Sequence, residues 1–114
     1  RPIPRALQGV LSEPVFTLGR KGTGADFHEH QEVWVAQVRG RKAWLLAPPD
    51  AQGLLPRGVM PCEVYRGRGL EKARRKLQVE NCTVSPGEVL FLPPRWFHNT
   101  CNLDDFTIGV GGRG

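Results

Sequence analysis

The chain has 114 residues, of which 39% are hydrophobic, and its 16 Lys and Arg against 11 Asp and Glu give a net charge of +5. This length fits a single domain with one hydrophobic core, and no run of about 18 apolar residues is present that could form a transmembrane helix. The 14 glycines and 10 prolines favour short strands joined by turns over a helical bundle.

The first half of the chain predicts an extended arm followed by strands. Residues 1–14 contain three prolines and form the expected N-terminal arm. Strands are expected over Val15–Leu18, within the β-rich stretch Phe27–Val38, and over Lys42–Ala47. A tight hairpin at Gly40 joins the last two of these, and Pro48-Pro49 ends the third.

The second half predicts an insertion and four more short strands. Residues 51–77 are rich in turn residues, but Leu70, Ala73 and Leu77 have helical spacing and predict one or two helical turns there. The strands are expected over Cys82–Val84, Val89–Leu92, Trp96–Asn102 and Phe106–Val110, before a flexible tail at Gly111–Gly114. Short strands with Gly and Pro between them indicate an all-β barrel or sandwich over residues 15–110.

The positive charge is concentrated in one segment. Arg66–Lys76 contains six basic residues and only Glu71 as an acidic one, which accounts for the whole excess of +5. Such a patch can dock an acidic partner, although a solvated surface is the simpler interpretation. No aromatic residue interrupts the patch, so nucleic-acid binding by base stacking is not favoured.

The three cysteines are Cys62, Cys82 and Cys101. The absence of any C-x-x-C pair excludes a zinc knuckle on spacing. The odd number argues against a disulfide scaffold and favours a soluble protein in a reducing compartment.

The chain also has only three histidines, His28, His30 and His98. His28 and His30 are two residues apart, so on a regular strand both side chains lie on one face, which Glu32 and Trp34 continue. A barrel can bring His98, on a later strand, to the same place. Three imidazoles there would suit iron, zinc, copper or nickel, whereas on a half-exposed strand they would be ordinary surface residues.

Two segments carry a family resemblance: GTGADFHEHQEVWVAQVRGRKAWLLAPPD and VSPGEVLFLPPRWFHNTCN. Together they resemble the cupin superfamily, and in particular its jumonji-C-like (cupin-8 type) branch of Fe(II)/2-oxoglutarate oxygenases. The positions that match the two general cupin motifs are Gly22, His28, His30, Gly87, Pro93, His98 and Asn102. The positions that match the additional motif of the jumonji-C-like branch are Gln37, Gly40, Lys42, Pro48 and Pro49. Arg95 stands where the second cupin motif usually has glycine.

The resemblance implies a double-stranded β-helix, the cupin or jelly-roll barrel, and hydroxylation of a protein or small molecule. His28 and His98 would be the first and last metal ligands, and Lys42 would bind the distal carboxylate of 2-oxoglutarate. The side chains that would line the substrate pocket are Trp34, Gln37, Trp96 and Asn102.

The sequence departs from this branch at the middle ligand, where His30 replaces the usual Asp or Glu. His30-x-Glu32 is an alternative ligand pair that would supply a carboxylate. Ala25 replaces a small hydroxyl residue, and an Asn usually found beyond the acidic ligand is missing. Two other functions therefore stay open: a catalytically degenerate cupin that serves as a structural or interaction subunit of a larger assembly, and a three-His metal cupin without 2-oxoglutarate.

Overall fold

The strands form where β-branched and aromatic residues lie between Gly and Pro turns. The computed structural model describes residues 13–51, 55, 61–64 and 79–114. The elements in chain order are β1 (Glu13–Gly19), β2 (Val33–Arg39), β3 (Lys42–Ala47), the 3-10 helix η2 (Pro49–Ala51), α1 (Pro61–Val64), β4 (Glu80–Val84), β5 (Val89–Leu92), β6 (Phe97–Asn102) and β7 (Thr107–Arg113). Neither described helix is long enough to cross a bilayer.

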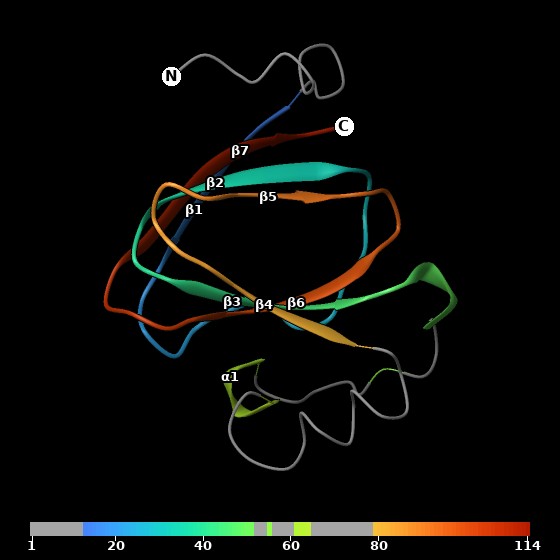
Figure 1. The fold of residues 1–114 in the computed structure, drawn as a ribbon, viewed down its shortest axis with the longest axis horizontal. Coiled ribbons are helices and arrows are strands. Elements are labelled where there is room, and N and C mark those ends of the chain that lie inside the picture. Colours follow the sequence, from blue (N-terminus) through green and yellow to red (C-terminus); the bar gives the residue numbers. More distant parts are fainter. Residues whose placement is uncertain (1–12, 52–54, 56–60, 65–78) are drawn as a thin grey trace.

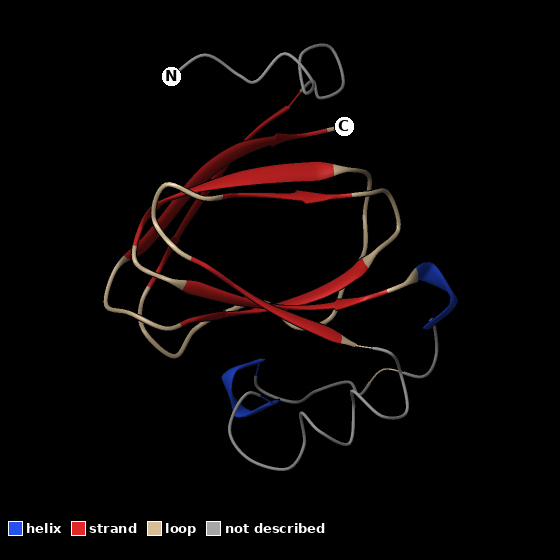
Figure 2. Ribbon diagram, viewed as in Figure 1, coloured by secondary structure: helices blue, strands red, loops and turns tan. Residues whose placement is uncertain are grey.

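Two antiparallel sheets face each other and enclose the core (Figures 1 and 2). The four-stranded sheet has the order β1-β7-β2-β5, and the three-stranded sheet has the order β4-β3-β6. The main core cluster combines Val33 and Val35 of β2 with Trp44 of β3, Val84 of β4 and Leu92 of β5. Side chains from both sheets therefore meet between them, which confirms the predicted all-β barrel.

A segment outside the named strands pairs with the free edge of β6. The Gly22 N–H donates to the Asn102 carbonyl, the Asn102 N–H donates to the Thr23 carbonyl, and the Thr100 N–H donates to the Ala25 carbonyl, at 2.8–2.9 Å. Gly24 makes this approach possible, because a Cβ at that position would collide with the Thr100 carbonyl. The segment leads directly to His28 and fixes its position.

The C-terminal end differs from the expected flexible tail. β7 continues to Arg113, and Gly111 pairs with Val15 of β1 on one side and with Val35 of β2 on the other. A glycine is needed at position 111, because a Cβ there would meet the Trp34 carbonyl. The glycines for which the sequence predicted a flexible tail therefore belong to β7, an inner strand of the four-stranded sheet.

Parts of three predictions lie outside the described residues. These are residues 1–12 of the expected arm, the helical turns at Leu70–Leu77, and the basic segment Arg66–Lys76. Glu13 and Pro14, which were expected to end the arm, belong to β1.

A disulfide joins Cys62 of α1 to Cys101 of β6, with their Cα atoms 5.0 Å apart, and Cys82 is free. The argument from the odd cysteine count was therefore wrong, because one pair and one free thiol satisfy the same count. The odd cysteine count therefore no longer supports a reducing compartment. The bonded pair packs with Ala43 and Leu103 on the face of the three-stranded sheet that points away from the core.

Candidate metal centre

His28 and His98 face each other across an isolated antiparallel bridge. The His28 N–H donates to the His98 carbonyl at 3.1 Å, and the His98 N–H donates to the His28 carbonyl at 3.0 Å. Directly opposed residues of an antiparallel pair project their side chains to the same face. The two imidazole centroids are consequently 4.1 Å apart.

His30 completes the cluster from the loop that precedes β2. Its carbonyl accepts a hydrogen bond from the Arg95 N–H at 2.9 Å, which ties this loop to the turn before β6. The His30 ring centroid lies 5.5 Å from that of His28 and 4.7 Å from that of His98. One ring nitrogen from each histidine lies within 4.8 Å of the others, a separation that one metal ion could bridge.

All three rings are held by the same kind of hydrogen bond. The Nδ1 atoms of His28, His30 and His98 lie 2.7, 2.7 and 3.0 Å from the backbone carbonyls of Asp26, Gln31 and Trp96. A carbonyl oxygen can only accept, so each Nδ1 must carry the proton. Each neutral ring then has its lone pair on Nε2, which is the form that ligates a metal, with the orienting backbone bond that such histidines usually make.

His98 is the most buried of the three, with 3% of its surface exposed. Burial lowers the pKa of His98 to about 4, although the hydrogen bond to the Trp96 carbonyl acts in the opposite direction. The positive charges of His28, His30 and Lys42 would lower the pKa further. His98 is therefore neutral at pH 7 and available as a ligand.

Glu32 is not in this cluster, which among the described residues consists of the three histidines. The Glu32 carbonyl accepts a hydrogen bond from the Gly114 N–H at 3.0 Å, and its carboxylate lies beside Gly114. The structure does not bring the alternative pair His30-x-Glu32 together.

Trp34 does not lie on the histidine face, contrary to the sequence expectation. Val33, Val35 and Gln37 point into the barrel, so Trp34 lies on the outer face of β2, opposite Phe91. The parity argument failed because Gln31 and Glu32 are not part of a strand, and the alternation restarts at Val33.

Gln37, Trp96 and Asn102 do reach the interior or its rim. The Gln37 amide donates to the Arg39 and Gly40 carbonyls, and the Asn102 amide donates to the Thr23 hydroxyl. Trp96 packs against the main core cluster, and its carbonyl orients His98.

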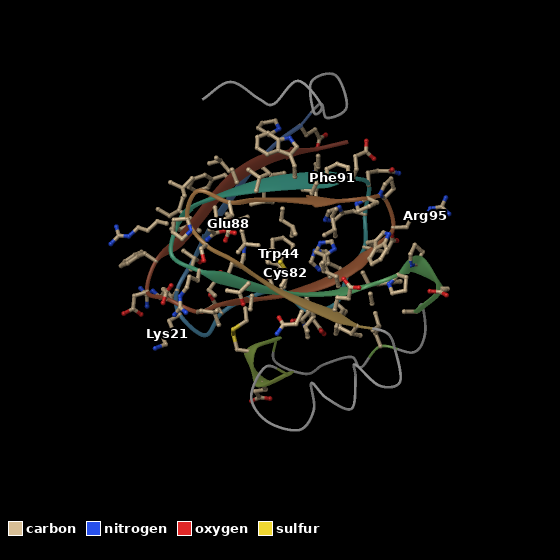
Figure 3. The ribbon with its side chains drawn as sticks, viewed as in Figure 1. Lys21, Trp44, Cys82, Glu88, Phe91 and Arg95 are labelled. Carbon is tan, nitrogen blue, oxygen red and sulfur yellow. A yellow bond between two sulfur atoms is a disulfide. The ribbon has the colours of Figure 1, made fainter. Side chains whose placement is uncertain are left out.

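Lys42 is a buried cation in the same interior, with 7% of its surface exposed. It lies opposite Asn102 on β6, and its Nζ is 5.6 Å from the ring of Trp44, which is in turn 5.7 Å from the ring of His98. Figure 3 shows Trp44 between the two sheets. Burial lowers the pKa of Lys42, and no carboxylate pairs with it among the interactions of the described residues.

Three buried polar atoms in this interior lack hydrogen-bond partners: Gln37 Oε1, Trp44 Nε1 and Asn102 Oδ1. Buried polar atoms are nearly always paired, so each of these atoms has the capacity to hydrogen-bond to a water molecule or a polar ligand. Trp44 was not among the pocket residues expected from the sequence. The Lys42-x-Trp44 spacing could have predicted this position, because it puts both side chains on one face of β3.

Arg95 adopts a φ of 66°, in the left-handed region that favours glycine. This explains why glycine is usual at this position of the cupin motif. Next to it, a cleft of about 290 Å³ is lined by Glu29, Pro49, Arg95 and Phe97. The Arg95 N–H donates to the His30 carbonyl, so the cleft lies near the loop that carries His30, whereas Phe97 packs with Leu45 and Ala47 on the face of β6 opposite His98.

We expect Arg95→Gly to be more stable than Arg95→Ala by about 1 kcal/mol, because only glycine adopts this conformation without steric cost. Urea unfolding of the two variants measures the difference. Equal stabilities would mean that the turn relaxes at no cost.

The fold and the histidine cluster agree with the comparisons to known proteins. A cupin-like domain family matches residues 4–111, and the chain belongs to this family. The human protein named JmjC domain-containing protein 8 is 33% identical over 105 residues, which cover 90% of this chain and 39% of that protein. The mouse protein named 2-oxoglutarate and iron-dependent oxygenase JMJD4 is 31% identical over 102 residues, covering 81% of this chain and 24% of that protein.

Solved structures show a similar fold at low sequence identity. Drosophila melanogaster CENP-C bound to CAL1 superposes with a TM-score of 0.59 and 7% identity, covering 90% of this chain and 65% of that one. The structure of CoII HppE in complex with Tris buffer gives a TM-score of 0.55 and 6% identity, covering 89% of this chain and 44% of that one.

The chain spans less than half the length of the curated relatives.

Proposed function

We propose that this chain is a jumonji-C-type Fe(II)- and 2-oxoglutarate-dependent oxygenase domain in which His28, His30 and His98 hold the iron. The observation that carries the proposal is the shared hydrogen bonding of the three rings, which leaves every Nε2 free to ligate. A relative described as a 2-oxoglutarate and iron-dependent oxygenase supports it. Bound iron would supply the activation of O2, and the protein residues orient and shield the site.

Lys42 fits the role of the 2-oxoglutarate residue. A buried ammonium group without an acidic partner is costly, and the carboxylate of a bound dianion would offset that cost. The unpartnered atoms of Trp44 and Asn102 lie on the same inner face and add one donor and one acceptor. Three neutral imidazoles also leave the metal with one more unit of positive charge than two imidazoles and a carboxylate would, which increases its attraction for an anion.

The substrate is proposed to approach through the cleft near the loop that carries His30. Its walls carry one acidic and one basic side chain, Glu29 and Arg95, together with Pro49 and Phe97. Such a lining suits a polar or peptide substrate, either a small molecule or a protein segment. A relative named HSPB1-associated protein 1, from rat, is 34% identical over 90 residues and is consistent with a protein partner.

The segment Arg66–Lys76 stays a proposed docking site for an acidic partner. The buried Cys62–Cys101 disulfide supports an oxidising compartment rather than the reducing one that the cysteine count favoured.

A three-His metal centre without 2-oxoglutarate is the second candidate, because no carboxylate belongs to the cluster in the described part of the chain. Anaerobic addition of Fe(II), followed by 2-oxoglutarate, separates the possibilities. A metal-to-ligand charge-transfer band supports the oxygenase proposal, and bound iron without a band supports the second candidate. Failure to bind metal supports the degenerate interaction subunit.

We expect Lys42→Met to abolish the 2-oxoglutarate-dependent band while Fe(II) binding persists, because the variant removes the only charge proposed to hold the distal carboxylate. The matched control is Lys21→Met, since Lys21 is exposed at the surface (Figure 3). An unchanged band in Lys42→Met would show that another group binds 2-oxoglutarate.

A further inference from the structure

The outer face of the four-stranded sheet is apolar and exposed. Among the described residues, six of the seven large hydrophobic side chains that are exposed lie on this face: Phe16, Leu18, Val38, Val89, Phe91 and Val110, with 40–67% of their surface exposed. The outer face of the three-stranded sheet differs, because α1 lies against it and is bonded to β6 (Figure 1). No described element covers the four-stranded sheet in the same way.

The exposed side chains form rows across the sheet. Phe16 of β1 lies opposite Val110 of β7, which lies opposite Ala36 of β2, which lies opposite Val89 of β5. Leu18 and Ile108 form a second row, and Trp34 with Phe91 forms a third. Directly opposed residues share a face, so the rows make one continuous surface.

Two strands of this sheet are apolar on both faces. β2 reads VWVAQVR and β5 reads VLFL, so the residues between the core positions are also hydrophobic. A sheet with one face in water alternates hydrophobic and polar residues, whereas near-continuous apolar strands are typical of sheets buried on both sides. The sequence of these strands therefore fits a covered face better than a solvated one.

The charges of this sheet favour a neutral partner. Its four strands carry one acidic residue, Glu13, and two basic residues, Arg39 and Arg113. Arg113 Nε donates to Glu13 Oε2 at 3.1 Å, which leaves the net charge of +1 at Arg39. A second copy would meet almost no like-charge repulsion here, while a lipid surface usually requires a fringe of several basic residues.

The exposed apolar area approaches the size that a dimer requires. The six side chains expose on the order of 600 Å² together, at the upper end for the largest apolar patch of a typical monomer. Each partner in a standard interface contributes about 800 Å², which Trp34, Ile108 and Pro14 around the six side chains bring within reach.

We propose that this face binds the same face of a second copy of the chain, in a two-fold symmetric dimer in which two four-stranded sheets pack together. Because the interface is isologous, the same apolar surface is contributed by both copies, and only residues near the two-fold axis meet their own symmetry mates. The proposal does not depend on metal binding, since these side chains point away from the barrel interior.

Sedimentation of the metal-free chain tests the proposal. We expect a dimer of 2 × 12.7 = 25.4 kDa at micromolar concentrations, and Phe16→Glu should raise the dimer dissociation constant by at least about 30-fold, because it buries a charge in the interface. Thr83→Glu is the matched control, since Thr83 is exposed on β4 of the other sheet, and it should leave the dimer unchanged. Circular dichroism checks that both variants fold.

A cysteine cross-link gives a second measurement that does not weaken the interface. We expect Val110→Cys, on the central strand β7 of this face, to form a disulfide-linked dimer on mild oxidation, and Thr83→Cys to form no disulfide-linked dimer. A chain that sediments as a monomer, a dimer that Phe16→Glu leaves intact, or a monomer that instead binds neutral lipid vesicles through this face would overturn the proposal.

Discussion

Replacing His98 with alanine is expected to lower the affinity for Fe(II) by at least about 100-fold, because one of only three proposed ligands is lost. His98 is the buried member of the cluster, and its ring lies within 4.1 and 4.7 Å of the other two ring centroids. No other histidine exists in the chain to replace it. Anaerobic Fe(II) titration followed by calorimetry measures the affinity.

Two neighbouring carboxylates provide matched controls for this experiment. Glu29 lies between His28 and His30 but is exposed, and Glu32 lies beside Gly114 outside the cluster. Glu29→Gln and Glu32→Gln should both keep the wild-type affinity. If Glu32→Gln lost the metal and His28→Ala retained it, the pair His30-x-Glu32 would be the true ligand set and the three-His centre would be wrong.

The strands were predictable where the local pattern is strong. Lys42–Ala47 and Val89–Leu92 match the structure residue for residue, because Gly40, Pro48 and Pro93 interrupt the chain at their ends. The end of β7 was not predictable from composition. Gly111 and Gly112 have no side chains to indicate a strand, and their pairing depends on two neighbouring strands from distant parts of the sequence.

The histidine cluster was predictable in outline, since a spacing of two and a barrel are enough to bring three rings together. The details of the cluster were not predictable. The side on which Trp34 lies depends on where the strand begins, and the loop at Gln31–Glu32 shifts that alternation. The hydrogen bonds of Nδ1 go to backbone carbonyls, which leave no trace in the identity of the residues that supply them.

The disulfide shows a different limit of the sequence. Pairing of Cys62 with Cys101 requires α1 to lie on the outer face of β6, and nothing in the turn-rich segment around Cys62 specifies that location. The side of β6 was predictable, because Cys101 is three residues from His98 and so projects to the opposite face. The cysteine that bonds to Cys101 was not predictable.

Removal of this disulfide is expected to lower the free energy of unfolding by about 4 kcal/mol, because the bond closes a loop with a sequence separation of 39 in the unfolded chain. The loss should also loosen the pairing of β6 with the segment before His28, since the Cys62 sulfur contacts the Thr23 carbonyl and Thr23 accepts a hydrogen bond from Asn102. Urea unfolding of the wild type with and without reductant measures the effect.

The double variant Cys62→Ala, Cys101→Ala separates the bond from the reductant. It should unfold at the same urea concentration in both conditions, close to that of the reduced wild type. Cys82→Ala keeps the bond and should keep the full response to reductant, because Cys82 is the free thiol. The unfolded, unreduced wild type should accordingly react with one equivalent of a thiol reagent; three reactive thiols and no effect of reductant would show that α1 is not bonded to the strand that carries His98.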